Sequence, residues 1–222
     1  MPPRLYLASS NPGKLRELSA LAATEGFEFA PVPGYEELPP YPEDQPSFAL
    51  NALEKALYYS CNVASAVSPR QVPFGSAQDR PGGPGVLVVA DDSGLVVDAL
   101  SGRPGVRSAR YAGPTATDAD NNRKLLEELS GVPPEKRAAR FVCALALARS
   151  EQVLALFSDY VEGRVLEAPR GAGGFGYDPL FYLPERGCTS AELSPEEKNR
   201  LSHRGKAFRK LLEFVKKVTG DS

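Results

Sequence analysis

Two adjacent aspartates, Asp91 and Asp92, follow a short apolar run and precede Ser93 and Gly94. The apolar run, residues 86–90, predicts a buried strand that ends at the aspartates, and α/β proteins bind ligands outside the carboxyl ends of strands. Successive strand side chains point to opposite faces, so we expect one aspartate to face a cleft and the other to support it. A carboxylate there can hold Mg²⁺ or activate a water. The same four residues are also common in ordinary turns.

A polar segment near the N-terminus follows the apolar residues 5–8 and reads Ser9-Ser10-Asn11-Pro12-Gly13-Lys14. Asn11 is a good N-cap and Pro12 suits a first helical position, which predicts that a helix begins here. The backbone N–H groups, the helix dipole and the Lys14 charge together suit a phosphate. The spacing is not that of a Walker P-loop, and a capped helix with a solvated lysine fits the segment equally well.

A glycine-dense loop at residues 171–176 leads into Tyr177 and Asp178. Glycines allow the backbone to approach a flat ligand closely, and Phe175 can stack on a nucleotide base. Asp178 offers hydrogen-bond acceptors, or a donor when it is protonated. The alternative is a loop whose aromatic residue anchors it to the core.

A basic stretch begins at Lys198 and reaches Lys217, with eight Lys or Arg against one acid, Glu213. His203 is the only histidine in the chain, which excludes a two-histidine metal motif. His203 and Arg204 directly precede a predicted helix, and their donors suit a phosphate or a carbonyl oxygen. The alternative is a solvated amphipathic helix. A further acidic pair, Glu43 and Asp44, precedes another predicted helix, where an acid alone also stabilises the helix dipole.

The predicted elements alternate between helix and strand. Helices are expected to start at residue 12 and to cover about 46–64, 118–129 and 204–218; in the second of these we expect Ala49, Leu53, Ala56 and Leu57 to be buried. Besides the segments at 5–8 and 86–90, strands are expected at 141–148 and 153–161, as a hairpin. This order predicts an α/β fold with a mixed sheet and flanking helices. Residues 67–85 contain four prolines and four glycines, which predicts a loop insertion within one domain spanning 1–222.

The composition is ordinary for a soluble globular protein of 222 residues. The 26 basic and 28 acidic residues give a net charge of −2, which argues against a nucleic-acid or membrane partner. No apolar run approaches the roughly 18 residues of a membrane span. Three widely spaced cysteines, Cys61, Cys143 and Cys188, argue against disulfides and zinc, so we expect a cytoplasmic protein.

Taken together, these motifs resemble those of the inosine triphosphate pyrophosphatase family, the XTP/dITP diphosphatases. The resemblance rests on Ser9, Asn11 and Lys14, on residues 90–95 with their continuation at 104–111, on residues 173–179, and on residues 202–205. It covers nearly the whole chain outside 67–85. It implies two lobes around a nucleotide-binding cleft, usually in a homodimer, and Mg²⁺-dependent hydrolysis of ITP, dITP or XTP to the monophosphate and pyrophosphate. Mn²⁺ is a possible substitute for Mg²⁺.

The resemblance also implies roles for individual residues. Asp92 falls at the acid that contacts the metal and accepts the water's proton, and Glu43 falls at a second metal-binding acid. The substrate-binding positions are Ser9, Ser10, Asn11, Pro12, Gly13, Lys14, Ser93, Phe175, Gly176, Tyr177, Asp178, Lys198, His203 and Arg204. Leu50 departs from the family pattern, because a glutamate is common there, and puts a metal-side acid in doubt.

Physical chemistry supports this interpretation. Donors from His203 and Arg204 would pair with a 6-oxo purine but would face the donor of the adenine amino group, and such complementarity discriminates by roughly 10⁴–10⁵-fold. Two other functions remain open: a Maf-type pyrophosphatase, whose family lacks the Ser-His-Arg-Gly signature at 202–205, and a nucleotide-binding module without turnover. Retention of Glu43 and Asp92 speaks against the second, because acids repel a triphosphate unless a metal intervenes.

Overall fold

The computed structural model describes residues 4–66 and 86–219. Its seven strands form one sheet in the order β2-β1-β3-β4-β5-β6-β7. The first three pair in parallel and the others pair antiparallel, so the predicted mixed α/β architecture is confirmed. The strands are β1 (Arg4–Leu7), β2 (Glu28–Pro31), β3 (Leu87–Val97), β4 (Ala138–Arg149), β5 (Gln152–Val165), β6 (Phe181–Leu183) and β7 (Cys188–Thr189).

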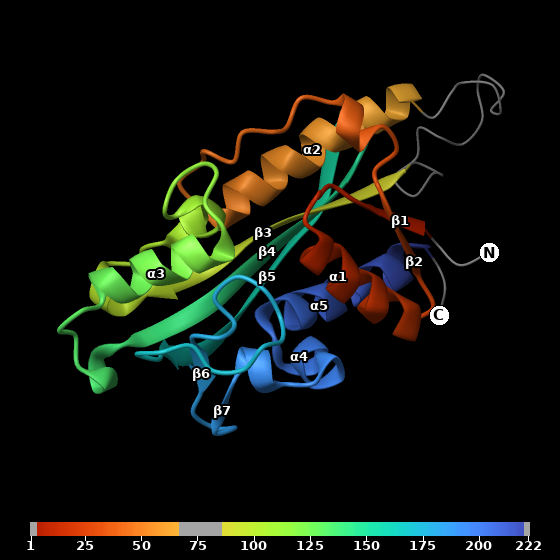
Figure 1. Cartoon of the computed structure of the whole chain (residues 1–222). Coiled ribbons are helices and arrows are strands. Elements are labelled where there is room, and N and C mark those ends of the chain that lie inside the picture. Colours follow the sequence, from red (N-terminus) through yellow and green to blue (C-terminus); the bar gives the residue numbers. More distant parts are fainter. Residues whose placement is uncertain (1–3, 67–85, 220–222) are drawn as a thin grey trace, which may run out of the picture.

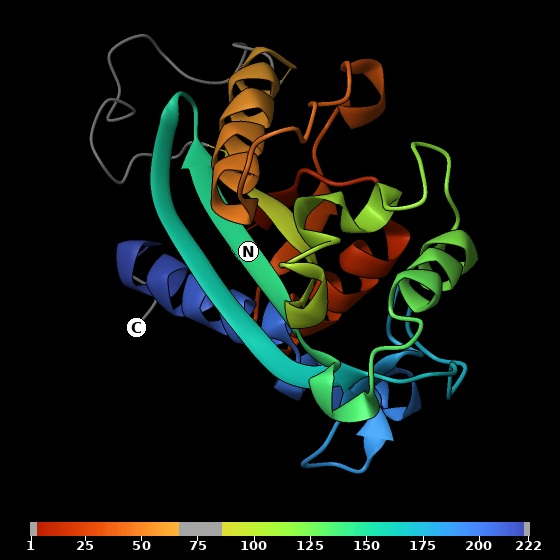
Figure 2. The same ribbon diagram turned by 90° about the vertical axis from the view of Figure 1, so that its left-hand side faces the viewer.

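Helices cover both faces of the sheet (Figures 1 and 2). On one face, α1 (Pro12–Thr24) and α5 (His203–Thr219) pack against side chains such as Val89 and Leu145. On the other, α2 (Phe48–Ala66) packs against Val88 and Ala90. The alternation of Val88, Val89 and Ala90 follows the two-residue period of a strand, and it decides which face each neighbouring side chain reaches.

A second group of buried side chains lies toward the other end of the long strands. It joins the last residues of β3 to helix α3 (Asp118–Glu128) and to β6, through Leu95, Leu125 and Phe181. The short helix α4 (Pro195–Leu201) leads directly into α5. A cavity of about 580 Å³ is lined by Tyr59 of the α2 core and by Phe141 and Tyr177 of this second group, which agrees with two lobes around a cleft.

Strand β3 differs from the expectation. It does not end at the aspartates but continues through them to Val97, with Asp91 opposite Leu145 and Asp92 opposite Ala144 on β4. The two carboxylates therefore lie in the middle of the sheet and not at a strand end. Both are stabilised there by partners from other elements, described below.

The buried face of α2 is also displaced from the predicted one. The buried residues are Asn51, Ala52, Lys55, Ala56, Tyr59 and Ser60, whereas Ala49, Leu53 and Leu57 are half-buried. An apolar pattern could not identify Asn51 and Lys55, because each is buried against a charged partner rather than against hydrocarbon. Lys55 and Tyr59 of this helix line the cavity.

Other expectations agree with the structure. The Asn11 side chain caps α1, and α3 and α5 begin within one residue of their predicted starts. The predicted hairpin is β4–β5, and both of its strands are longer than expected. The proposed insertion at 67–85 lies outside the described residues. Within the part that is described, no helix combines the length and apolarity needed to cross a membrane.

Candidate active site

The cavity brings together residues from every motif singled out in the sequence. Its lining includes all of the predicted site residues except Pro12 and Gly13. Segments from the N-terminal turn, the middle of β3, the glycine loop and the start of α5 are far apart in the sequence and meet here. Lys55, Ser108, Arg110, Asp118, Asn121 and Phe141 also line it and were not predicted.

The N-terminal turn offers its lysine to a ligand rather than its first backbone donors. Asn11 Oδ1 accepts hydrogen bonds from the N–H groups of Gly13 (2.9 Å) and Lys14 (3.1 Å). These two groups are therefore not free for a phosphate, contrary to the expectation from the helix N-terminus. The Lys14 ammonium reaches the cavity and forms an ion pair with Asp91.

Asp92 is the carboxyl group best suited to accept a proton. Its residue is only 4% exposed, and Asn51 Nδ2 donates a 2.8 Å hydrogen bond to Oδ2. Burial, reinforced by the negative charges of Glu43 and Asp91, raises the pKa of Asp92 to about 6. A carboxyl that titrates near neutrality matches the requirement for a general base.

Glu43 is held next to this carboxyl by contacts from two other segments. Its carboxylate pairs with Lys55 of α2, and its backbone oxygen accepts from the Arg110 guanidinium. Burial opposes ionisation, but the Lys55 charge lowers the pKa of Glu43 below its ordinary value. Glu43 is therefore a fixed anion on the same cavity as Asp92.

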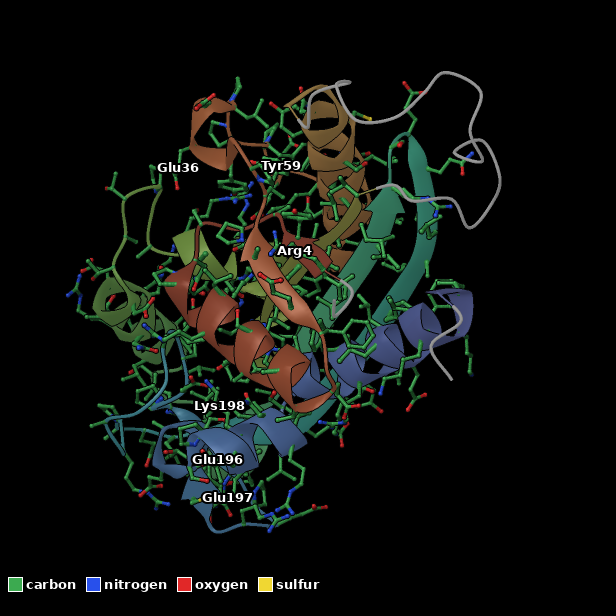
Figure 3. All side chains as sticks on the ribbon, turned by 90° about the vertical axis from the view of Figure 1, so that its right-hand side faces the viewer. Arg4, Glu36, Tyr59, Glu196, Glu197 and Lys198 are labelled. Atoms are coloured by element: carbon green, nitrogen blue, oxygen red, sulfur yellow. The ribbon has the colours of Figure 1, made fainter. Side chains whose placement is uncertain are left out.

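Glu17 joins two of the cavity's cations and was not predicted. It accepts from Lys198 Nζ at 2.6 Å and from Arg204 Nη1 at 2.5 Å. Figure 3 shows Lys198 on α4, where that short helix faces α1. Lys198 also pairs with Asp178 at 2.6 Å, and Asp178 accepts from the Phe175 N–H at 2.8 Å. These contacts tie the glycine loop to α1 and α4.

The aromatic side chains of the site are held firmly in place. The His203 ring stacks on Phe141, with centroids 4.9 Å apart and planes 12° apart. Burial and the Arg204 charge hold the pKa of His203 well below its usual value, so the ring is neutral. Its Nδ1 is buried without a hydrogen-bond partner among the described residues. A ligand that pairs with this ring would satisfy it.

Phe175 and Tyr177 are already engaged. Lys198 Nζ lies 4.8 Å from the centre of the Phe175 ring, and the Arg204 guanidinium lies 5.5 Å from it. The same ring packs so closely on Gly13 that a Cβ there would lie 2.7 Å from a ring carbon. The Tyr177 hydroxyl donates to the Ser108 backbone oxygen at 2.9 Å. Both aromatic residues shape the wall of the cavity.

Comparison with known proteins places this geometry in a family. The model of the Ham1 family matches residues 5–214. The chain belongs to the Ham1 family. This Ham1 protein is 50% identical over 216 residues to the dITP/XTP pyrophosphatase of Geobacillus kaustophilus, covering 97% of this chain and 96% of the relative. The dITP/XTP pyrophosphatase of Geobacter sulfurreducens is 44% identical over 212 residues, covering 96% of each chain.

Solved structures agree with this assignment. A HAM1 protein from Coxiella burnetii superimposes on this Ham1 protein with a TM-score of 0.78 at 35% identity, covering 97% of this chain and 99% of that one. The Ham1 protein of Staphylococcus aureus gives a TM-score of 0.74 at 31% identity, with coverage of 99% and 100%. The resemblance drawn from the motifs is confirmed, and so is the fold that it implied.

The acids of this Ham1 protein suit a metal that arrives with its ligand. The described residues contain no group of three His, Cys, Asp or Glu side chains arranged to hold an ion. Mg²⁺ is usually bound by one or two carboxylates together with phosphate oxygens and waters. Glu43 and Asp92, which line one cavity together with Lys14, provide such a partial set.

Spacing along two helices could have revealed three of the missed residues in the Ham1 sequence. Glu17 follows Lys14 by three residues and therefore shares its side of α1. Asn51 and Lys55 are four apart, so one polar stripe crosses an otherwise apolar helix. The strand period predicted that Asp91 and Asp92 point to opposite faces of β3, and this is confirmed, but no local signal identifies Lys14 and Arg204 as the partners of Asp91.

Proposed function

We propose that this Ham1 protein hydrolyses deaminated purine nucleoside triphosphates, namely ITP, dITP and XTP, to the nucleoside monophosphate and pyrophosphate. The observation that carries the proposal is a buried carboxyl, Asp92, with a pKa of about 6, on the same cavity as three cations, Lys14, Lys198 and Arg204. The relatives named dITP/XTP pyrophosphatase support the same reaction.

The reaction joins a water to the α–β phosphoanhydride. The water oxygen bonds to the α-phosphorus, and the bond from that phosphorus to the bridging oxygen breaks. The water's proton passes to the Asp92 carboxylate, and pyrophosphate leaves with the electron pair of the broken P–O bond. Phosphoryl transfer depends on positioning and charge neutralisation more than on covalent catalysis. Asn51 fixes Oδ2 of Asp92 at 2.8 Å, which leaves Oδ1 for the proton.

Mg²⁺ is the proposed cofactor, with Mn²⁺ as a possible substitute. Glu43 and Asp92 would hold it, together with phosphate oxygens of the substrate. When bound, the ion neutralises charge on the phosphates and polarises them. Leu50 is 41% exposed and does not line the cavity, so the absence of an acid at this position leaves the proposed metal side unchanged.

We assign purine selectivity to His203 and Arg204, which also line the cavity. Arg204 carries only hydrogen-bond donors, and the neutral His203 ring has one unpaired nitrogen there. A 6-oxo group accepts from such donors, whereas the 6-amino group of adenine would leave donors facing donors. An unpaired buried polar group costs about 1–3 kcal/mol, which supports discrimination against ATP.

We also propose a cytoplasmic homodimer. Leu156 and Tyr160 of β5 are 40% and 53% exposed, and they pair with Ala146 and Val142 of β4. Ala146 packs with the α2 core, so these side chains lie on the sheet face that α2 covers only in part. A second copy would bury this apolar surface. The three free cysteines suit a reducing compartment.

The direct test is pyrophosphate release from ITP, XTP, ATP, GTP, dTTP and dUTP, each with and without Mg²⁺. Selective, metal-dependent release from ITP and XTP is expected. Preference for pyrimidines would overturn the assignment of His203 and Arg204 and favour a Maf-type activity. Tight binding without turnover would make the protein a nucleotide-binding module.

A further inference from the structure

Asp91 occupies an unusual position beside the cavity. It is fully buried, and it is absent from the cavity lining, although its strand neighbours Asp92 and Ser93 both line it. Its side chain points to the α1–α5 face of the sheet, opposite to that of Asp92. Asp91 therefore lies behind the cavity wall and is not part of its lining.

Its two carboxylate oxygens instead bind two cations that do reach the cavity. Oδ1 pairs with Lys14 Nζ, and Oδ2 accepts from Arg204 Nε at 3.1 Å. Lys14 comes from the N-terminal turn and Arg204 from the start of α5, and both line the cavity. One buried carboxylate thus links the phosphate-side cation to the base-side cation.

The remaining contacts hold that carboxylate still. The Ser93 hydroxyl lies 2.9 Å from each oxygen, and the Cys143 thiol lies 3.4 Å from Oδ2. Arg204 has a second anchor in Glu17, whereas Asp91 is the one ion-pair partner of Lys14 among the described residues. The two cations therefore share one anion, and loss of the Lys14 contact leaves Arg204 as the only ion-pair partner of Asp91 among the described residues.

We propose that Asp91 is a positioning residue that couples triphosphate binding at Lys14 to base recognition at Arg204. The inference rests on the proposed function, because it takes Lys14 as the phosphate contact and Arg204 as the base contact. When Lys14 is absent, the full charge of Asp91 acts on Arg204 and draws the guanidinium toward β3, away from the base. Loss of a phosphate contact then weakens base selectivity at Arg204.

The experiment compares kcat/KM for dITP and dATP in the wild type and in single variants. Asp91→Asn removes the charge that anchors Arg204 Nε at 3.1 Å, so the guanidinium loses its fixed position, and we expect the dITP:dATP ratio to fall about tenfold. Lys14→Gln should lower that ratio several-fold, although the lysine never meets the base. A ratio unchanged in both variants would overturn the coupling.

Two control variants separate coupling from general damage. Lys55→Gln also removes a cation that lines the cavity, but Lys55 pairs with Glu43 and not with Asp91, so both substrates should lose equally and the ratio should hold. Asp98→Asn removes an acid just after β3 that pairs with Arg140 on the surface, and both rates should stay at the wild-type level. If Asp91→Asn does not fold by circular dichroism, Lys14→Gln decides.

A binding measurement distinguishes failure of the coupling from failure of the proposed function. Inosine probes the base end without a phosphate, and inorganic tripolyphosphate probes the other end. If the wild type binds both without turnover, weaker inosine binding in Lys14→Gln still supports the coupling, and equal binding refutes it. If the wild type neither hydrolyses dITP nor binds either probe, the proposed function and the coupling are both wrong.

Discussion

Asn51 on α2 donates a 2.8 Å hydrogen bond to Oδ2 of Asp92 on β3, across the interface between helix and sheet. This contact selects one oxygen of the carboxylate and leaves the other to the cavity. It also explains why a polar residue occupies the fully buried face of α2. The orientation of the proposed general base therefore depends on the packing of α2. The same helix carries Lys55, the ion-pair partner of Glu43.

Replacing Asp92 by Asn should abolish turnover, by at least about 10³-fold, because the proton acceptor is lost. The same change should stabilise the metal-free fold. Burial raises the pKa of Asp92 from 3.8 to about 6, so ionisation at pH 7 costs the folded state about 3 kcal/mol. Urea unfolding in EDTA at pH 7.5 measures the gain. It should shrink as the pH falls from about 6 and vanish below about pH 3, where the carboxyl is protonated in both states. A variant that is both active and no more stable contradicts the assignment.

The activity itself should follow the ionisation of Asp92. At low Mg²⁺, kcat/KM is expected to rise with pH and to level off above about 6, as the buried carboxyl loses its proton. A cation next to the carboxylate favours the charged form, so saturating Mg²⁺ should move the inflection to lower pH. Profiles of kcat/KM against pH at two metal concentrations test this. An inflection at the same pH in both profiles would show that Asp92 does not bind the metal.

Lys14→Ala should raise KM for dITP by about tenfold or more, because the phosphate side of the cavity loses a full charge. It should also lower the free energy of unfolding by about 3 kcal/mol, since Asp91 is left with one cation in place of two. Steady-state kinetics and urea unfolding measure the two effects. Lys216→Ala, which removes an exposed pair with Glu25, is the matched control and should change neither by much. An unchanged KM would remove Lys14 from the site.

Gly13→Ala tests the contact between the N-terminal turn and the glycine loop. A Cβ at this position would lie 2.7 and 2.8 Å from two carbons of the Phe175 ring, so the ring must move. We expect a stability loss of about 1–3 kcal/mol and a higher KM for dITP. Gly26→Ala introduces the same methyl group where nothing lies within 4 Å, although its φ of +77° adds backbone strain. Normal kinetics in Gly13→Ala would show that the Phe175 position is irrelevant to binding.

Tyr160→Glu tests the proposed dimer. A charge on the exposed apolar face of β5 should shift the protein from dimer to monomer in sedimentation experiments. Lys216→Ala again serves as a surface control and should leave the mass unchanged. If the wild type sediments as a monomer at micromolar concentration, this face has another role.

Much of the site could be predicted from the sequence because most of its residues belong to short local motifs. Asn11 and Pro12 mark the start of α1, and the apolar periods mark α3, α5 and the β4–β5 hairpin. The course of β3 could not be predicted in this way. Two aspartates and a glycine normally end a strand. Asp91 is stabilised inside β3 by Lys14 and Arg204, which lie 77 and 113 residues away from it in the sequence.

The same limit explains the residues that were missed. Glu17, Asn51 and Lys55 bind partners on distant segments. Their spacing along α1 and α2 marks them as candidates, but neither composition nor hydrophobic period identifies the partners. Where burial is driven by hydrocarbon the sequence pattern identifies it. Where burial depends on a matching charge, only the assembled fold identifies the charged partner.

The opposite directions of Asp91 and Asp92 make strand register itself a requirement for activity. The side-chain period of a strand is two residues, so a slip of β3 by a single residue against β4 would exchange the faces of the two carboxylates. The proton acceptor would then lie among Lys14 and Arg204, and the structural anion would lie in the cavity. An insertion or deletion of one residue anywhere between Val89 and Asp91 should therefore inactivate the enzyme even where the sheet still forms.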